Sequence, residues 1–295
     1  MKISGCILLV VVASLYACDQ GLSQSSRVDN GPNSEDQITE KQNIIDPDGA
    51  TILTRILVPR NFKRTTASPA SFGGYLRELP LKAHNVPVKY YNGRVKENRN
   101  VYDAVVDLDI GKRDLHQCAD AVMRLRAEYL YGQKKYDRIH FNFTNGFRVD
   151  YEKWRKGQRI VVDGNKTYWK ASARPSDTYE TFWKYLEIIF SYAGTLSLEK
   201  ELQPVNLNDL EIGDVFIQGG SPGHAVIVVD VAVNENTGEK IFLLAQSYMP
   251  AQEIQILKNP NNEALSPWYS ENFGEVLKTP EWTFNKSTLR RFGDR

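Results

Sequence analysis

The stretch "GHAVIVVDVAVNENTGEKIFLLAQSY", residues 223–248, decides the predicted fold. Its first part, "HAVIVVDVAV", is an almost continuous apolar run, which is typical of a buried strand. The polar segment "NENTGEK" predicts a turn, and "IFLLAQSY" then returns as an antiparallel partner strand. Together with a short strand predicted at "GDVFIQ" (213–218), these segments indicate a small antiparallel sheet.

A helix is predicted within residues 114–131, "DLHQCADAVMRLRAEYLY". Asp114 and Gln117 have the spacing of a capping box, which places Cys118 in the first turn. From Cys118 onward, apolar side chains recur on one face at helical spacing. Residues 131–208 separate this helix from the predicted strands.

The chain opens with "MKISGCILLVVVASLYACDQ", which resembles a lipoprotein signal peptide. Lys2 precedes an apolar run that is too short to span a bilayer, and "LYAC" ends in the cysteine of a lipobox. The resemblance implies a signal peptide over residues 1–17 and a lipid on Cys18. We therefore expect a protein of the bacterial cell envelope that is attached to a membrane through a lipid anchor at Cys18.

Composition and charge bound the rest of the chain. Residues 18–43 contain almost no large apolar side chains, so they predict a flexible tether, and a single domain is expected over residues 44–295. The full chain of 295 residues is 41% hydrophobic and 25% charged, which is the composition of a soluble globular protein. A net charge of +1 indicates no preference for nucleic acid, so no nucleic-acid partner is expected. We expect neither a metal ion nor a cofactor.

Processing of the N-terminus would leave Cys118 as the one unpaired thiol, which is unusual in an oxidising compartment. A helix N-terminus stabilises a thiolate through the helix dipole and free N–H groups. An adjacent imidazolium lowers the thiol pKa further and can protonate a leaving amine. We therefore predict that Cys118 is a nucleophile whose pKa lies below the usual value of about 8.5.

His224 is the favoured partner of this thiol because it opens the long apolar strand and would be held rigidly there. The remaining histidines are interpreted as structural: His84, His116 and His140. An imidazole also needs a third group to fix its tautomer and orientation. The strand expected to pair with the His224 strand offers Gln246 and Ser247, and we favour Gln246 because its amide oxygen can orient the ring.

An acyl-transfer site also needs donors for a developing oxyanion. The backbone N–H of Cys118 is expected to be one of them, because it lies at a helix start. The second donor is left open between Gln117 and His116.

The order of Cys118, "GDVF", "GHAVIVVDV" and "LLAQSY" resembles the papain-like cysteine peptidase superfamily, and within it the NlpC-type cell-wall amidohydrolases. This resemblance implies an α+β papain-like fold in which the nucleophile helix packs on a small antiparallel sheet. The chain departs from the NlpC-type pattern in having "QCAD" around the cysteine and an amide as the third residue. The interval from Cys118 to His224 is also long for that family, which implies inserted structure in residues 131–208. From about Ile44 onward, the chain is also similar to an uncharacterised family of bacterial lipoproteins, a domain of unknown function.

These features predict a hydrolase in which Cys118 attacks an amide bond and forms an acyl-enzyme. Location and family resemblance suggest a peptide or peptidoglycan-like substrate, with peptidoglycan stem peptides as the first expectation. Two alternatives stay open. One is an acyl or peptidyl transferase that uses the same three residues, and the other is a catalytically inert binding lipoprotein on the same scaffold.

Overall fold

The computed structural model describes residues 42–164 and 166–293. The expected signal peptide, the lipidation site Cys18 and nearly all of the expected tether lie outside the described residues. Gln42, within that tether, is described: it donates to the Val58 carbonyl at 3.3 Å and accepts from the Arg60 N–H at 2.7 Å. No helix in the described part of the chain is long and apolar enough to cross a membrane.

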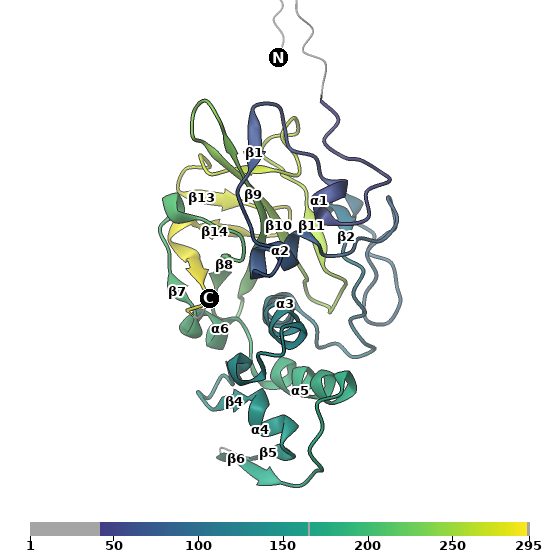
Figure 1. Ribbon diagram of the computed structural model, residues 1–295, viewed down its shortest axis with the longest axis vertical. Coiled ribbons are helices and arrows are strands. Elements are labelled where there is room, and N and C mark those ends of the chain that lie inside the picture. Colours follow the sequence, from purple (N-terminus) through teal and green to yellow (C-terminus); the bar gives the residue numbers. More distant parts are fainter. Residues whose placement is uncertain (1–41, 165, 294–295) are drawn as a thin grey trace, which may run out of the picture. The chain divides into compact units, whose positions relative to one another are not determined.

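One large antiparallel sheet dominates the described residues and has nine strands there (Figure 1). In chain order its strands are β1 (Phe62–Arg64), β2 (Tyr102–Val105), β7 (Gln203–Pro204), β8 (Val215–Gln218), β9 (His224–Asn234), β10 (Lys240–Gln246), β11 (Gln255–Leu257), β12 (Tyr269–Ser270) and β15 (Leu289–Arg291). Their spatial order is β2-β11-β10-β9-β8-β15-β7, while β1 pairs with β9 and β12 pairs with β10. The long strands β9 and β10 therefore lie at its centre.

Short hairpins and helices surround this sheet. The hairpins are β3 (His140–Asn142) with β4 (Arg148–Asp150), β5 (Gln158–Asp163) with β6 (Lys166–Ala171), and β13 (Val276–Lys278) with β14 (Thr283–Asn285). The α-helices are α1 (Ile52–Arg55), α2 (Phe72–Arg77), α3 (Cys118–Gly132), α4 (Tyr151–Arg155), α5 (Tyr179–Tyr192) and α6 (Thr195–Glu201). Helix α3 contacts β9 and also α5, so it lies between the sheet and the elements formed by residues 136–192 (Figure 1).

Both faces of β9 are buried, which explains its unbroken apolar sequence. Ala225, Ile227 and Val229 belong to the hydrophobic core that includes α3. Val226 and Val228 alternate with them and belong to a second core on the opposite side of the sheet. The strand can therefore carry polar side chains with access to a site only near its ends.

The expected papain-like α+β fold is wrong. Helix α3 does contact β9, but the sheet is large and mostly antiparallel, and the helices are few and do not pack on a small sheet. The strands that enlarge it come from both ends of the described chain: β1, β2, β11, β12 and β15. Each of these strands has only two to four residues and pairs with a strand that is distant in the sequence. The apolar periodicity within a short stretch of sequence therefore does not reveal it.

A buried ion-pair network ties the segment before α3 to β9. Asp230, in the middle of β9, has no exposed surface. Its two carboxylate oxygens accept from Nε of Arg64 and Nε of Arg77, each at 2.6 Å. Arg77 also donates to the carbonyls of Thr65 and Val231, so α2 is fastened to the central strand.

We predict that Asp230→Asn lowers the free energy of unfolding by about 3 kcal/mol or more, because it leaves the buried guanidinium group of Arg77 and the half-buried one of Arg64 without their counter-charge. Urea denaturation measures this change. The control is Glu235→Gln, which removes an exposed pair with Lys63 (3.8 Å) at the far end of the same strand and should cost less than about 0.5 kcal/mol. Equal losses in the two variants would show that the Asp230 network does not stabilise the fold.

Candidate active site

Cys118 is the first residue of α3, as expected, and the preceding residue Gln117 is the helix cap. The acidic side chain that completes this cap is Asp120, whose Oδ2 accepts from the Gln117 N–H at 2.9 Å. Asp114, expected in that role, instead accepts from the Gln117 side chain at 3.2 Å and from the Ala251 N–H at 2.7 Å. These bonds tie the helix start to the loop that follows β10.

The start of α3 lies where β9 and β10 separate. Their last paired residues are Ile227 and Ala245, beyond which β10 pairs with β11 alone. In this opening, Ser247 Oγ donates to the His116 carbonyl at 2.9 Å. The backbone N–H of Ala225 is close enough to the Cys118 thiol to lower its pKa. Cys118 is thus held next to the residue that follows His224.

His224 and Gln246 meet at the same end of the sheet, as the sequence predicted. His224 Nε2 and Gln246 Oε1 are 2.8 Å apart, and both side chains are buried. The His224 ring is enclosed by Tyr248, Trp282 and Phe284, with ring centroids 4.7, 5.4 and 5.8 Å away. The other ring nitrogen, Nδ1, makes no hydrogen bond with any described residue, the thiol of Cys118 included.

Two charged residues that the sequence did not single out lie behind Gln246. Gln246 Nε2 donates to Glu281 Oε2 at 2.7 Å, and Lys96 Nζ donates to the same oxygen at 2.7 Å. Lys96, only 3% exposed, also donates to Gln252 Oε1 at 3.0 Å. Neither Glu281 nor Lys96 belongs to a periodic segment, so the folded chain is needed to identify them.

Burial keeps both members of the thiol–imidazole pair neutral. It raises the pKa of Cys118 to about 11, with a smaller contribution from the Asp120 carboxylate, against hydrogen bonds from the N–H groups of Ala119, Cys118 and Ala225. Burial also lowers the pKa of His224 to about 4; the Gln246 hydrogen bond opposes this and the Lys96 charge adds to it. The predicted thiol pKa below about 8.5 is therefore wrong, because desolvation outweighs the stabilisation of a thiolate by the helix start.

The two candidates for a second oxyanion donor are placed differently. The His116 ring is buried edge-to-face against Phe190 of α5, with centroids 5.7 Å apart, and burial lowers its pKa to about 3. Gln117 lies beside the thiol in sequence, but its side-chain amide donates to Asp114 and its N–H donates to the Asp120 carboxylate. The Ala225 N–H, which no pattern in the sequence indicated, is instead among the groups that lower the pKa of the thiol.

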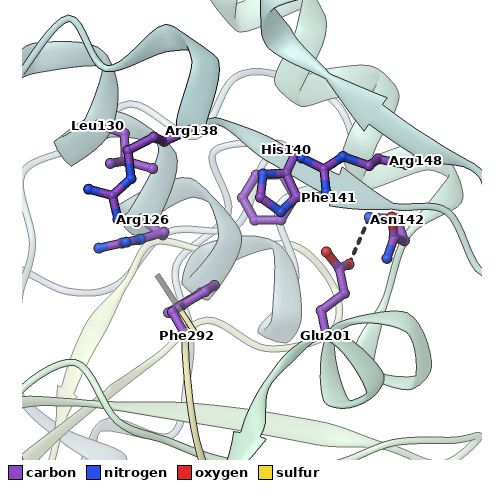
Figure 2. Close-up of a pocket in the computed structure, with 10 residues that line it drawn as sticks. Arg126, Leu130, Arg138, His140, Phe141, Asn142, Arg148, Glu201 and Phe292 are labelled. Atoms are coloured by element: carbon purple, nitrogen blue, oxygen red, sulfur yellow. Dashed lines mark hydrogen bonds between the residues drawn. The ribbon is translucent and has the colours of Figure 1, made fainter. Parts of the chain in front are cut away.

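A separate cavity of about 320 Å³ lies between α3, β3, β4 and α6 (Figure 2). It is lined by Arg126, Leu130, Arg138, His140, Phe141, Asn142, Arg148, Glu201, Phe292 and Gly293. Burial raises the pKa of Glu201 to about 7, although its carboxylate accepts the Asn142 N–H at 2.7 Å. Cys118, His224 and Gln246 do not line this cavity, and the thiol residue is 9% exposed.

A sequence-family model described as "Domain of unknown function (4846)" matches residues 52–291. No curated protein and no solved structure matches the chain. Within the described residues, no cluster of three or more His, Cys, Asp or Glu side chains could hold a metal ion.

Stability should depend on pH through His224. Its pKa is about 4 in the folded protein and 6.5 in a solvated reference, so below pH 6.5 the unfolded chain binds this proton more tightly. The contribution of His224 to the free energy of unfolding is fully present above pH 6.5. It decreases by about 3 kcal/mol as the pH falls from 6.5 to 4. Urea denaturation measures the free energy of unfolding at pH 7.5 and at pH 4. The difference between these two values should be smaller in His224→Gln than in the wild type, by about the contribution of His224. An unchanged difference would contradict the burial of a neutral imidazole.

Alkylation of Cys118 by iodoacetamide should be slow at neutral pH in the native protein. A shift of the thiol pKa from 9.0 to about 11 leaves roughly 100-fold less thiolate at pH 7. The rate should rise about tenfold per pH unit up to pH 9 and be much higher in urea. A native rate that is already high at pH 6 and stays constant to pH 9 would indicate a preformed thiolate–imidazolium pair.

Proposed function

The chain belongs to the family described as "Domain of unknown function (4846)", and we propose, from the geometry of its site, that it is a cysteine-dependent hydrolase of amide bonds. One observation carries the proposal: a cysteine at a helix start lies near Ala225, the residue that follows a histidine, and Nε2 of that histidine is hydrogen-bonded by an amide at 2.8 Å. A nucleophile, a base and a group that orients the base form the minimal set for acyl transfer through a thiol. The likeness to papain-like peptidases is limited to the site and its local sequence, because the overall fold differs from that of papain.

In the proposed reaction both side chains begin neutral. The thiol sulfur attacks the amide carbonyl carbon while His224 Nδ1 takes the thiol proton. The resulting oxyanion accepts hydrogen bonds from N–H groups at the start of α3 and from Ala225. The imidazolium then protonates the leaving amine, and the C–N bond breaks to give a thioester on Cys118. Water, deprotonated by His224, hydrolyses that thioester and restores the thiol.

The proposed substrate class is a peptide amide, with the stem peptides of peptidoglycan as its first member. Support comes from the local likeness of "GDVF" and "GHAVIVVDV" to cell-wall amidohydrolases and from the lipobox pattern at Cys18. We propose accordingly that the protein acts in the bacterial cell envelope, attached to a membrane by the lipid. No step of this chemistry requires a nucleic acid or a cofactor.

Burial of the thiol favours a second candidate function, a binding lipoprotein without turnover. Cys118 is 9% exposed and His224 has no exposed surface. The cavities of about 320 and 520 Å³ are lined by other residues. In that case, the Cys118, His224 and Gln246 side chains would serve to hold α3 against the end of β9.

The hydrolase proposal predicts that the purified protein releases new amines from peptidoglycan stem-peptide fragments. Cys118→Ala should abolish release, His224→Ala should lower kcat by roughly 10³-fold or more, and Gln246→Ala should lower it less, because orientation is a partial contribution. An amine assay with mass spectrometry of the products measures this order.

The matched control is His84→Ala, at a histidine that lines a different cavity, and it should keep wild-type activity. Activity that survives Cys118→Ala would exclude this cysteine as the nucleophile. No turnover on any peptide amide, with Cys118 unlabelled by peptide electrophiles, would favour the binding lipoprotein.

A further inference from the structure

Glu281 fixes the orientation of the Gln246 amide group. A carboxylate only accepts hydrogen bonds, so the amide NH₂ of Gln246 must face Glu281, to which it donates at 2.7 Å. The amide oxygen consequently faces the other way, toward His224 Nε2 at 2.8 Å. An amide oxygen also only accepts, so Nε2 is the ring nitrogen that carries the proton.

A neutral imidazole has one N–H, so a proton on Nε2 leaves the lone pair on Nδ1. This Nδ1 atom is buried and has no hydrogen-bond partner in the described part of the chain. The Ala225 N–H is close enough to the Cys118 thiol to lower its pKa, so Cys118 lies at the same end of β9. The lone pair on Nδ1 is thus left without a partner at the end of the strand that also holds the thiol.

Lys96 makes this arrangement depend on Glu281. Its ammonium group donates to the same Glu281 oxygen that accepts from Gln246, so the ammonium and the amide are close together. An ammonium group is a donor only. Without the carboxylate between them, Lys96 would attract the oxygen end of the amide and favour a flip that turns the NH₂ toward His224. Nε2 would then have to accept, and the proton would move to Nδ1.

We propose that Glu281, held by Lys96, is a positioning residue that fixes the His224 tautomer, with the proton on Nε2 and Nδ1 free to act as the base. The tautomer follows from contacts of the described residues alone. The role of Nδ1 as a base rests on the proposed function. Glu281 touches neither the thiol nor a substrate in this scheme and acts only through Gln246.

The test is ¹⁵N NMR of histidine-labelled full-length protein at pH 7.5, with the His224 signals assigned by their loss in His224→Gln. In the wild type, Nε2 should carry the proton and Nδ1 should be aprotic. In Glu281→Gln, of nearly the same size, part or all of the population should move the proton to Nδ1. Glu275→Gln, the same change at an exposed glutamate paired with Lys286, should keep the wild-type spectrum. A proton on Nδ1 in the wild type, or an unchanged tautomer in Glu281→Gln, overturns the proposal.

Kinetics separate this proposal from the proposed function. If the protein is an amidase, Glu281→Gln should lower kcat at least tenfold and leave KM within about twofold, because tautomer orientation affects the chemical step. Turnover that depends on Cys118 with an unchanged tautomer would retain the amidase and refute the role of Glu281. A shifted tautomer in a protein without turnover would refute the amidase and retain that role.

Glu281→Gln leaves a buried ammonium group and can fail to fold. The double variant Lys96→Met with Glu281→Gln removes both charges together and should fold. It should give a mixture of the two tautomers, since nothing then orients the amide. A double variant that keeps the proton on Nε2 alone, as in the wild type, also overturns the proposal.

Discussion

The pairing of β9 with β10 is the constraint on which the rest of the structure depends. From Val233–Lys240 to Ile227–Ala245 the two strands lie side by side, and β9 is buried on both faces. Polar side chains are therefore confined to the ends of the pair or to a buried network such as that of Asp230. Where the pairing stops, backbone groups are released from the ladder, and the N–H of Ala225 becomes available to the thiol.

This geometry places a helix start against a strand start. The first N–H groups of a helix have no partners within the helix, and they need external acceptors when they are buried. Asp120 accepts from the cap residue, and the N–H groups of Cys118 and Ala119 lower the pKa of the Cys118 thiol. The position that suits an oxyanion is therefore also one that the fold must satisfy for its own stability. Burial of the thiol is the consequence, and it is the reason that the resting sulfur is protonated.

Local sequence patterns were sufficient for the elements that form by local rules. The hairpin of β9 and β10, the placement of Cys118 in the first turn of α3 and the contact of His224 with Gln246 all follow from apolar periodicity, a turn and a helix start. The nine-stranded sheet did not follow, because strands as short as β12 and β15 are defined by distant partners. The prediction of a lowered thiol pKa was also wrong, because burial is a property of the folded chain.

An amide as the third residue changes the electrostatics of the site. A carboxylate in that position would stabilise an imidazolium directly, whereas an amide supplies no charge and can bind in either of two orientations. Here a carboxylate, Glu281, lies behind the amide and accepts from it, and Lys96 offsets its charge. The Gln246 hydrogen bond orients the imidazole and raises its pKa, but burial outweighs this contribution and leaves the pKa at about 4. Such a site would hold its thiol proton until a substrate carbonyl begins to collect negative charge at the N–H groups of α3, so proton transfer would be coupled to attack.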